Sequence, residues 1–475
     1  MSQARDRMVR NSGFILLQRA ALLVVGVLYA LIVPRVLGPG DFGRLSLLIS
    51  LSTLFFIAGD LGLPQALCRQ LPELLPGSTL DLRRAWLGVL LRVRVGVSLL
   101  AAGAFFGLTA CFFPDLPRPA IGALALAIVV GGVVDPLVTW LLGRNEADRW
   151  GWSFLLRRAQ YLVLLPLGYR WGGLNGAALG VVAAEALVLV YALRQHPEGW
   201  NLRASAATVP RAFWTLALSF LAGNVLAGAY RYSGETLVRW SGCDYHEVGF
   251  FGAALNVFAA AEAGAVQLLA STAPFLSGEM AAGRRAETAR WLERLLVILL
   301  AVGGAGVVAA FAWAEALVPR IFGAAFQPVA AVLPLTATAL VAAVLAHVAV
   351  NAALAARRPR VYIGSAALRL ALFWAVGLPA ARLWGAWGAW LGALLAHAVA
   401  AAWATAAARR EVPYRARFVL VPLGLLLPSC WLAAVGWGGA GLLVYAGGLL
   451  ASRLVQRDEW QTVRRVWRAR REKAT

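Results

Sequence analysis

Several arginines stand inside or at the edge of long apolar runs, where a charged side chain is costly to keep. They are Arg19, Arg92, Arg94, Arg157, Arg158, Arg231 and Arg369. For any one of them, snorkelling or helix-end anchoring explains the position as well as a functional role does. However, Arg19, Arg94, Arg157 and Arg369 fall at similar depths on four separate runs. Because guanidinium groups match phosphate oxygens in pairs of hydrogen bonds, this set predicts a cationic vestibule for an anionic, phosphate-bearing ligand.

Acidic residues also lie within the apolar runs: Asp60, Asp135, Glu185 and Glu262. Glu185 and Glu262 lie nearest the middle of their runs, so either is a candidate to carry an ion or a proton. A salt bridge to an interior arginine is an equally good interpretation of both. Asp60 lies near the inner end of its run, within reach of Arg19 or Arg69. Asn224 is a polar residue in an apolar run, and we expect it to line the ligand site.

The composition identifies the elements that must hold these residues. The chain has 475 residues, of which 60% are hydrophobic and 14% charged, and its mean hydropathy is +0.71. These values predict an all-α polytopic membrane protein. The net charge of +21 comes almost entirely from arginine, in short clusters between apolar runs. That pattern is typical of cytoplasmic loops and argues against nucleic acid as a partner.

We place about fourteen transmembrane helices along the chain, each long enough to cross a bilayer. They lie near residues 14–34, 42–63, 86–112, 118–140, 152–169, 174–193, 212–234, 248–277, 292–314, 328–356, 361–381, 385–408, 418–435 and 438–453. With the N-terminus inside, most arginines fall on inner segments, so both termini are predicted to be cytoplasmic. The longest outer loop is expected at 235–247. The basic tail reads as an amphipathic helix on the anionic inner leaflet. The four histidines share no metal-ligand spacing, and no cofactor is expected.

The sequence contains an internal repeat. Residues 170–180, RWGGLNGAALG, match residues 382–392, RLWGAWGAWLG, at six of eleven positions when shifted by 212. The same shift pairs Ser153 with Ser365 and Arg157 with Arg369. Because each copy contains six spans, we expect two pseudo-symmetric lobes of parallel orientation around a central cavity, exposed to alternate sides by rocking. The predicted domains are 1–205 (helices 1–6), 206–412 (helices 7–12), 413–453 (two further transmembrane helices) and 454–475 (basic cytoplasmic tail).

Short motifs carry a resemblance to a known family. The segment Arg35–Gly43, RVLGPGDFG, is similar to the first-loop signature of polysaccharide and O-antigen flippases. These flippases belong to the multidrug/oligosaccharidyl-lipid/polysaccharide (MOP) exporter superfamily. Asp60-Leu-Gly-Leu, Val248-Gly-Phe-Phe-Gly-Ala-Ala and Phe322-Gly also resemble that family. The resemblance implies a V-shaped two-lobe fold, in which Arg19, Arg94 and Arg231 lie on spans that line the cavity.

The resemblance further implies a function. Undecaprenyl-pyrophosphate-linked oligosaccharide would move from the inner to the outer leaflet of the bacterial inner membrane, for cell-surface polysaccharide, including lipopolysaccharide O-antigen. Glycosyltransferases and a polysaccharide polymerase would be its partners, beside membrane lipid. A lipid II flippase stays open as an alternative, because that subfamily has fourteen spans. Two further alternatives are a cation-coupled multidrug exporter of the same superfamily and a polyprenyl-sugar glycosyltransferase, ligase or polymerase. The short outer loops, with few carboxylates, argue against an enzyme.

Overall fold

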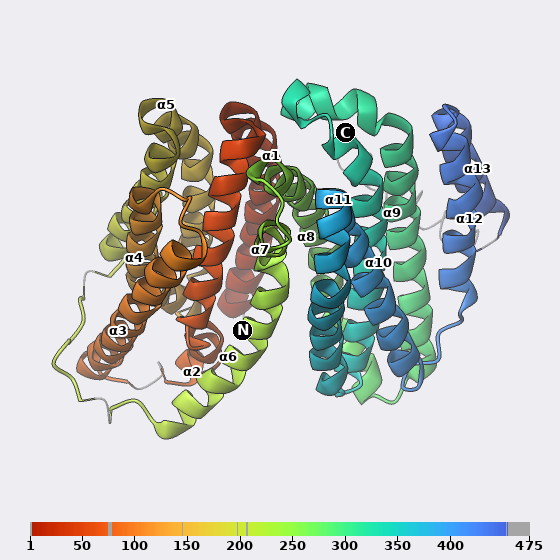
Figure 1. Cartoon of the computed structure of the whole chain (residues 1–475). Helices are drawn as coiled ribbons and strands as arrows, with labels where there is room; N and C mark the ends of the chain where they lie inside the picture. Colours follow the sequence, from red (N-terminus) through yellow and green to blue (C-terminus); the bar gives the residue numbers. More distant parts are fainter. Residues whose placement is uncertain are drawn as a thin grey trace, which may run out of the picture. The chain divides into compact units, whose positions relative to one another are not determined.

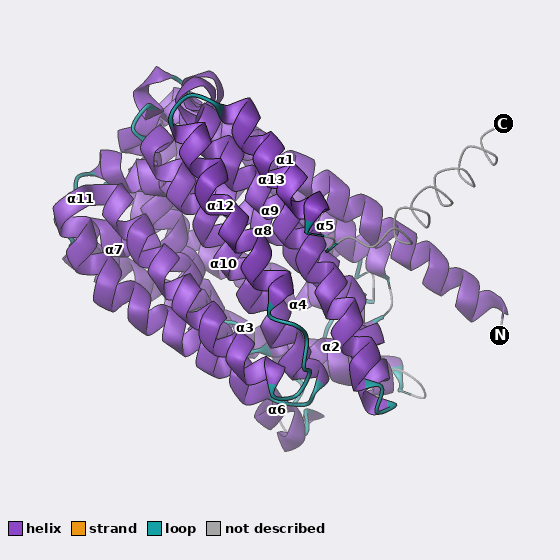
Figure 2. Ribbon diagram, turned by 90° about the vertical axis from the view of Figure 1, so that its right-hand side faces the viewer, coloured by secondary structure: helices purple, strands orange, loops and turns teal. Residues whose placement is uncertain are grey.

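A computed structural model describes residues 2–74, 78–144, 146–196, 198–205, 208–452 and 454. Within these residues every regular element is a helix and none is a strand (Figure 2). The helices are α1 (Ser2–Ala58), α2 (Leu63–Leu74), α3 (Leu80–Phe112), α4 (Arg118–Gly143), α5 (Ala147–Arg194), α6 (Arg211–Tyr232), α7 (Gly234–Trp240), α8 (Tyr245–Ala281), α9 (Arg285–Phe322), the 3-10 turn η2 (Ala324–Phe326), α10 (Val329–Ala355), α11 (Pro359–Arg409), α12 (Arg417–Ala434) and α13 (Gly438–Ala451). The predicted amphipathic tail lies outside the described residues.

Ten of the described helices are long and apolar enough to cross a membrane, and α13 is a shorter apolar helix. Three of the ten, α1, α5 and α11, contain 57, 48 and 51 residues. At a rise of 1.5 Å per residue, about 50 residues extend about 75 Å, which is more than twice the ~30 Å hydrocarbon core of a bilayer. A single straight crossing therefore does not accommodate any of the three.

Glycines break these long helices. The backbone leaves helical geometry at Gly38 in α1, at Gly172 and Gly173 in α5, and at Trp384 and Gly385 in α11. In α5, a Cβ atom added to Gly176 would lie 2.0 Å from the carbonyl oxygen of Gly168, so the two halves pack back on each other. The six resulting segments, together with α3, α4, α6, α8, α9, α10, α12 and α13, correspond to the fourteen predicted spans. The predicted fold class is confirmed.

The repeat is visible in the backbone angles. Gly173 has φ 57° and ψ −141°, and Gly385, 212 positions later, has φ 56° and ψ −137°. A Cβ atom at Gly388 would lie 2.0 Å from the carbonyl oxygen of Ala380, which are the positions equivalent to Gly176 and Gly168. Positive φ at this turn favours glycine, and the close approach leaves no room for a side chain. The α5 and α11 hairpins are therefore two copies of one structure.

The chain forms two compact units, Met1–Ala253 (unit 1) and Ala254–Thr475 (unit 2), and the division falls inside α8. In unit 1, α4 packs against α3 and α5, and α1 contacts α3, α4, α5 and α6 (Figure 1). In unit 2, α10 packs between α9 and α11, while α12 and α13 pack on α9. The predicted domain boundaries follow the repeat rather than compactness, and they stay a prediction.

Two short helices were not expected. α2 follows the turn at Asp60 and carries its apolar residues on one face, burying Leu63, Leu67 and Leu71. α7 overlaps the first half of the predicted outer loop 235–247, and Glu235 and Leu237 on it are buried. Neither segment is long enough to appear as a span in a hydropathy reading.

Candidate functional site: two buried polar clusters

Arg94 lies in the interior of unit 1. Its side chain on α3 is 1% exposed, and its Nη2 atom lies 3.8 Å from Oδ2 of Asp135 on α4. Its guanidinium carbon stands 4.7 Å from the centre of the Phe56 ring. None of its three side-chain nitrogens has a hydrogen-bond partner. Since charge-assisted hydrogen bonds are typically about 2.7–2.9 Å long, the contact with Asp135 is electrostatic only.

Asp60 occupies the turn between α1 and α2, beyond the span that ends at Ala58. Its Oδ1 atom accepts the backbone N–H of Gly62 at 2.5 Å, and the residue is 8% exposed. The Asn224 side chain on α6 also bonds Asp60. The amide groups of Asn224 and Gln65 exchange hydrogen bonds of 3.2 and 3.5 Å. Two predicted site residues, Asp60 and Asn224, are therefore neighbours, and Arg94 interacts electrostatically with Asp60.

Arg157 and Glu185 form an ion pair inside α5. Nη2 of Arg157 lies 3.0 Å from Oε2 of Glu185. The hydroxyl group of Tyr161 donates to the other carboxylate oxygen at 2.7 Å. Asp135 also interacts with Arg157, so this pair is continuous with the cluster around Arg94. Of the two interpretations of Glu185, the salt bridge is the arrangement present in the structure.

Unit 2 holds a second cluster. Oε1 of Glu262 on α8 lies 3.0 Å from Nε2 of His347 on α10. His397 on α11 is buried, and its ring centre lies 5.5 Å from that of Phe258. Arg369, Glu262 and His347 all act electrostatically on His397. The two site residues predicted in this unit, Glu262 and Arg369, thus belong to one histidine-containing cluster.

The two clusters occupy equivalent positions of the repeat. A shift of 212 pairs Asp135 with His347, Arg157 with Arg369 and Glu185 with His397. Each unit therefore carries an arginine between two titratable positions, which are acids in unit 1 and histidines in unit 2. Of these three pairs, the arginine pair is predicted from the sequence. The same shift, applied to every ionisable residue, identifies the other two pairs.

Two predicted site residues lie elsewhere. Arg231 is exposed in the last turn of α6, and its guanidinium carbon lies 6.0 Å from the ring of Tyr232. The side chain of Arg19 lies outside the described residues. The structure groups the other seven into one cluster in each unit, and a vestibule shared by the arginines of both lobes stays a prediction. Within the described residues, no group of three His, Cys, Asp or Glu side chains is arranged to hold a metal ion.

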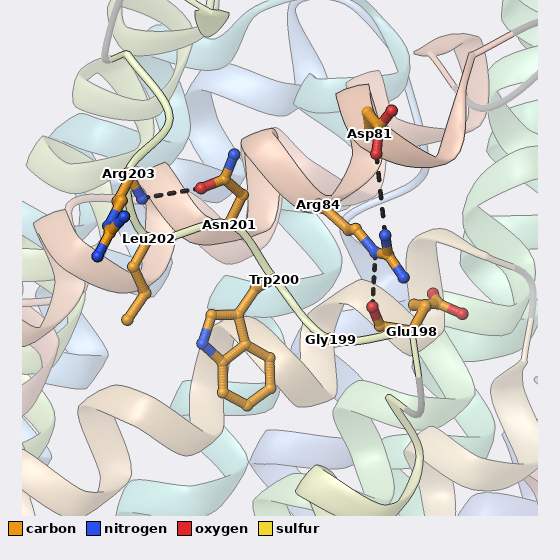
Figure 3. A pocket seen from close by; sticks show the side chains of 8 residues that line it. All are labelled: Asp81, Arg84, Glu198, Gly199, Trp200, Asn201, Leu202 and Arg203. Carbon is orange, nitrogen blue, oxygen red and sulfur yellow. Dashed lines mark hydrogen bonds and ion pairs between the residues drawn. The ribbon is translucent and has the colours of Figure 1, made fainter.

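A surface pocket lies apart from both clusters, where the segment after α5 passes over the start of α3 (Figure 3). Its lining consists of Asp81, Arg84 and residues 198–203. Nε of Arg84 donates to the carbonyl oxygen of Glu198 at 2.6 Å, and the N–H of Asn201 donates to that of Arg84 at 2.9 Å. Gly88 admits the backbone of Asn201 so closely that a Cβ atom would meet it at 1.9 Å. These contacts fix the segment on α3.

The RVLGPGDFG signature forms a polar cluster at the break of α1. Asp41 accepts hydrogen bonds from Arg44 at 2.8 Å and from the Tyr169 hydroxyl at 2.7 Å. Gly43 approaches the carbonyl oxygen of Tyr245 so closely that a Cβ atom would lie 2.0 Å from it. The role of the signature visible in unit 1 is thus to join α1 to α5 and to the start of α8.

A second ion pair lies near this signature, where Arg239 on α7 is 2.9 Å from Asp115 in the α3–α4 loop. Although burial raises the pKa of Asp115, the neighbouring Tyr245 hydroxyl and the hydrogen bond from Arg239 hold it below its ordinary value. The ionised pair links α7 to the α3–α4 loop.

Comparison with known proteins shows that this fold is similar to that of several transporters of known structure. The structure is similar to the lipid II flippase MurJ in an inward closed conformation, with a TM-score of 0.65, 13% identity and coverage of 95% of this chain and 99% of that one. It is also similar to an inward-facing multidrug resistance MATE family transporter of the MOP superfamily, with a TM-score of 0.67, 15% identity and coverage of 83% and 94%. A eukaryotic MATE transporter matches with a TM-score of 0.55, 16% identity and coverage of 86% and 99%. No protein-family model matches the sequence, and neither does any curated protein. The chain has the fold of the MOP exporters and is a multi-pass membrane protein.

Proposed function

We propose that this protein is a flippase for lipid-linked saccharides. It would carry undecaprenyl-pyrophosphate-linked oligosaccharide from the inner to the outer leaflet of the bacterial inner membrane. The product would serve cell-surface polysaccharide synthesis, including lipopolysaccharide O-antigen. Glycosyltransferases that build the glycan and a polymerase that extends it are the partners this role requires. The protein would act as a transporter and not as an enzyme.

The observation that carries the proposal is the match along nearly the full chain to a flippase. MurJ covers 95% of this chain, whereas the MATE structures cover 83–86%. The surplus of arginine in the apolar segments supports an anionic head group, because guanidinium groups pair well with pyrophosphate oxygens.

In the proposed mechanism, Arg369 and Arg231, with Arg19, bind the pyrophosphate group. The sugar enters the polar interior while the polyprenyl chain stays in the lipid, and the lobes then expose the head group to the other leaflet. Arg157 is neutralised by Glu185 at 3.0 Å, so its contribution to ligand binding is the weakest of the predicted set.

A second candidate is export of cationic drugs. The buried carboxylates Asp60, Glu185 and Glu262 and the likeness to MATE transporters favour it. Those carboxylates lie beside Arg94, Arg157 and His347, however. A cationic drug that bound to them would have to displace these partners. Lipid II is the alternative substrate within the flippase class.

The test is reconstitution of the purified protein in liposomes with labelled polyprenyl-pyrophosphate oligosaccharide, followed by measurement of label in the opposite leaflet. Parallel samples receive labelled lipid II or a cationic dye. Protein-dependent movement of the oligosaccharide alone supports the proposal. Movement of lipid II alone would identify the protein as a lipid II flippase, and movement of the dye alone would identify it as a drug exporter.

Variants then test the site. We expect Arg369→Ala and Arg231→Ala to slow flipping at least about tenfold, since losing one charge-assisted phosphate contact costs about 1.5–3 kcal/mol. The matched control is Arg170→Ala, which removes an exposed arginine at the tip of the α5 hairpin. If all three variants flip at the wild-type rate, the function stands but the assigned site is wrong.

A further inference from the structure

The charged groups around Arg94 do not balance. Asp60, Asp135 and Glu185 are three carboxylates, and Arg94 and Arg157 are the two guanidinium groups that interact with them. Cys68 on α2 also interacts with Asp135, and the remaining neighbour, Asn224 on α6, is uncharged. If all five groups were ionised, the side chains of this cluster that the structure describes would carry one excess negative charge in the interior of unit 1. Burial of an uncompensated charge is strongly unfavourable, so one carboxyl group must bind a cation.

The geometry indicates which carboxyl group this is. Glu185 has Arg157 at 3.0 Å and a hydrogen bond from Tyr161. The side chain of Asp135 is 20% exposed and faces Arg94. Asp60 is 8% exposed, and among the described side chains it forms no ion pair within 4.0 Å. Its described hydrogen-bond partners are the Gly62 N–H and the Asn224 amide, which are uncharged.

Arg94 is held between two carboxyl groups without being bonded to either. Its contact with Asp135 is 3.8 Å long, and all three side-chain nitrogens lack a hydrogen-bond acceptor at 1% exposure. The face of Phe56 supports the guanidinium plane. A buried guanidinium group with all its donors unused has a strong tendency to gain an acceptor.

We propose that Asp60 is a proton-binding site, and that its occupancy decides whether Arg94 pairs with Asp135 or with Asp60. With the proton bound, Asp60 is neutral and Arg94 balances Asp135. When the Asp60 O–H bond breaks and the proton leaves to water, the new carboxylate attracts Arg94. Asp135, the most exposed of the three carboxylates, then loses its partner. The exchange moves a side chain of α3 toward the turn that joins α1 to α2.

The chemistry of Asp60 agrees with this role. Burial raises the pKa of the Asp60 carboxyl group and Asp135 raises it further, while the Gly62 N–H, Arg94 and Asn224 oppose the rise. As a step that couples proton movement to passage of the head group, the site rests on the proposed transport function. The proton site itself does not require it.

The test is infrared difference spectroscopy of the purified protein in lipid, without substrate, between acidic and alkaline pH. A protonated carboxyl group absorbs where the amide bands do not. Glu235 is a second buried carboxyl group whose pKa is raised by burial, so all proteins in the series carry Glu235→Gln to remove its band. In this background we expect a carboxyl band that disappears on the alkaline side, is absent when Asp60→Asn is added, and persists when Asp135→Asn is added. Asp60→Glu should shift the band, which keeps the assignment testable if Asp60→Asn does not fold. The matched control, Asp81→Asn, removes an aspartate whose side chain is 94% exposed, and the band should be unchanged.

A band that persists in Asp60→Asn, or one lost in Asp135→Asn instead, overturns the proposal, as does the absence of any such band. Flipping assays separate this result from the function. If the protein flips glycan but shows no Asp60 band, the proton site is rejected and the flippase function stands. If the band is present but no glycan moves, the proton site stands and the flippase function is rejected. With both present, flipping by Asp60→Asn should lose its pH dependence, whereas that of Asp81→Asn should keep it.

Discussion

At the scale of single residues, unit 1 depends on how its buried charges are matched. Glu185 and Arg157 are 3.0 Å apart, with side chains 7% and 21% exposed. The Tyr161 hydroxyl satisfies the second carboxylate oxygen. Removing one partner of a buried pair leaves the other charge without compensation, which is worse than removing both.

We therefore expect Glu185→Gln to destabilise the protein by about 3–5 kcal/mol, seen as a lower midpoint of thermal unfolding in detergent. The matched control is Glu287→Gln, because the side chains of Glu287 and its partner Arg290 are 36% and 66% exposed. Ion pairs in solvent contribute little to stability, so the control should have the same unfolding midpoint as the wild type. Equal midpoints for all three proteins would contradict the buried pair.

Glu235 on α7 predicts a dependence of stability on pH. It is 2% exposed, and the Ser46 hydroxyl donates to it at 2.9 Å. Burial raises its pKa above the ordinary value of 4.5, with hydrogen bonds from Ser46 and Ser50 opposing the rise. Because the folded pKa is the higher one, Glu235 costs no stability below pH 4.5 and destabilises the fold progressively as pH rises from there toward the folded pKa.

Glu235→Gln keeps the shape and removes the ionisation. We expect its unfolding midpoint to match that of the wild type in acid and to exceed it at neutral and alkaline pH, as measured by thermal scans across pH. Asp81→Asn, which changes an aspartate whose side chain is 94% exposed, should follow the wild type. A wild type and a Glu235→Gln variant that respond identically to pH would show that Glu235 ionises freely in the fold.

At the scale of elements, small residues decide how the hairpins close. Gly176 approaches the carbonyl oxygen of Gly168, and Gly388 approaches that of Ala380 in the same way. We expect Gly176→Ala and Gly388→Ala each to destabilise by about 1–3 kcal/mol, because the neighbouring atom is backbone and has little freedom to shift. Gly107→Ala is the control, since nothing lies within 4 Å of a Cβ atom there. It should be neutral or stabilising by up to about 1 kcal/mol. Similar unfolding midpoints for all three variants would contradict the close packing.

The elements also show what the sequence was able to predict. Hydropathy located the spans, because each must present about 20 apolar residues to lipid. The match of 170–180 with 382–392 identified the repeat, since Gly173 and Gly385 are needed for one backbone turn. The residues that contact Arg94 could not be predicted in this way. Its contact with Asp135 depends on the rotation of α3 against α4, which packing sets and periodicity does not.

At the scale of the whole molecule, the fold predicts the membrane topology, whatever the substrate is. The α5 tip at Gly172–Gly173 and the α11 tip at Trp384–Gly385 are equivalent turns of the repeat. Between them lie the second half of α5, α6, α8, α9, α10 and the first half of α11. Because that is an even number of crossings, both tips must lie on the same side of the membrane.

The arginine distribution predicts that this side is the outer one and that both termini are cytoplasmic. Trp171 and Trp384 are 82% and 54% exposed, so each is suited to replacement by cysteine in a variant that lacks the native cysteines. We expect Trp171→Cys and Trp384→Cys both to react with a membrane-impermeant maleimide on intact cells, and an N-terminal epitope to be detected only after permeabilisation. Reaction at one tip alone would require an odd number of crossings and would contradict the paired hairpins. Reaction at both tips only after permeabilisation would agree with the fold but show that the orientation in the membrane is inverted. The substrate would then have to enter from the face of the protein opposite to the one predicted.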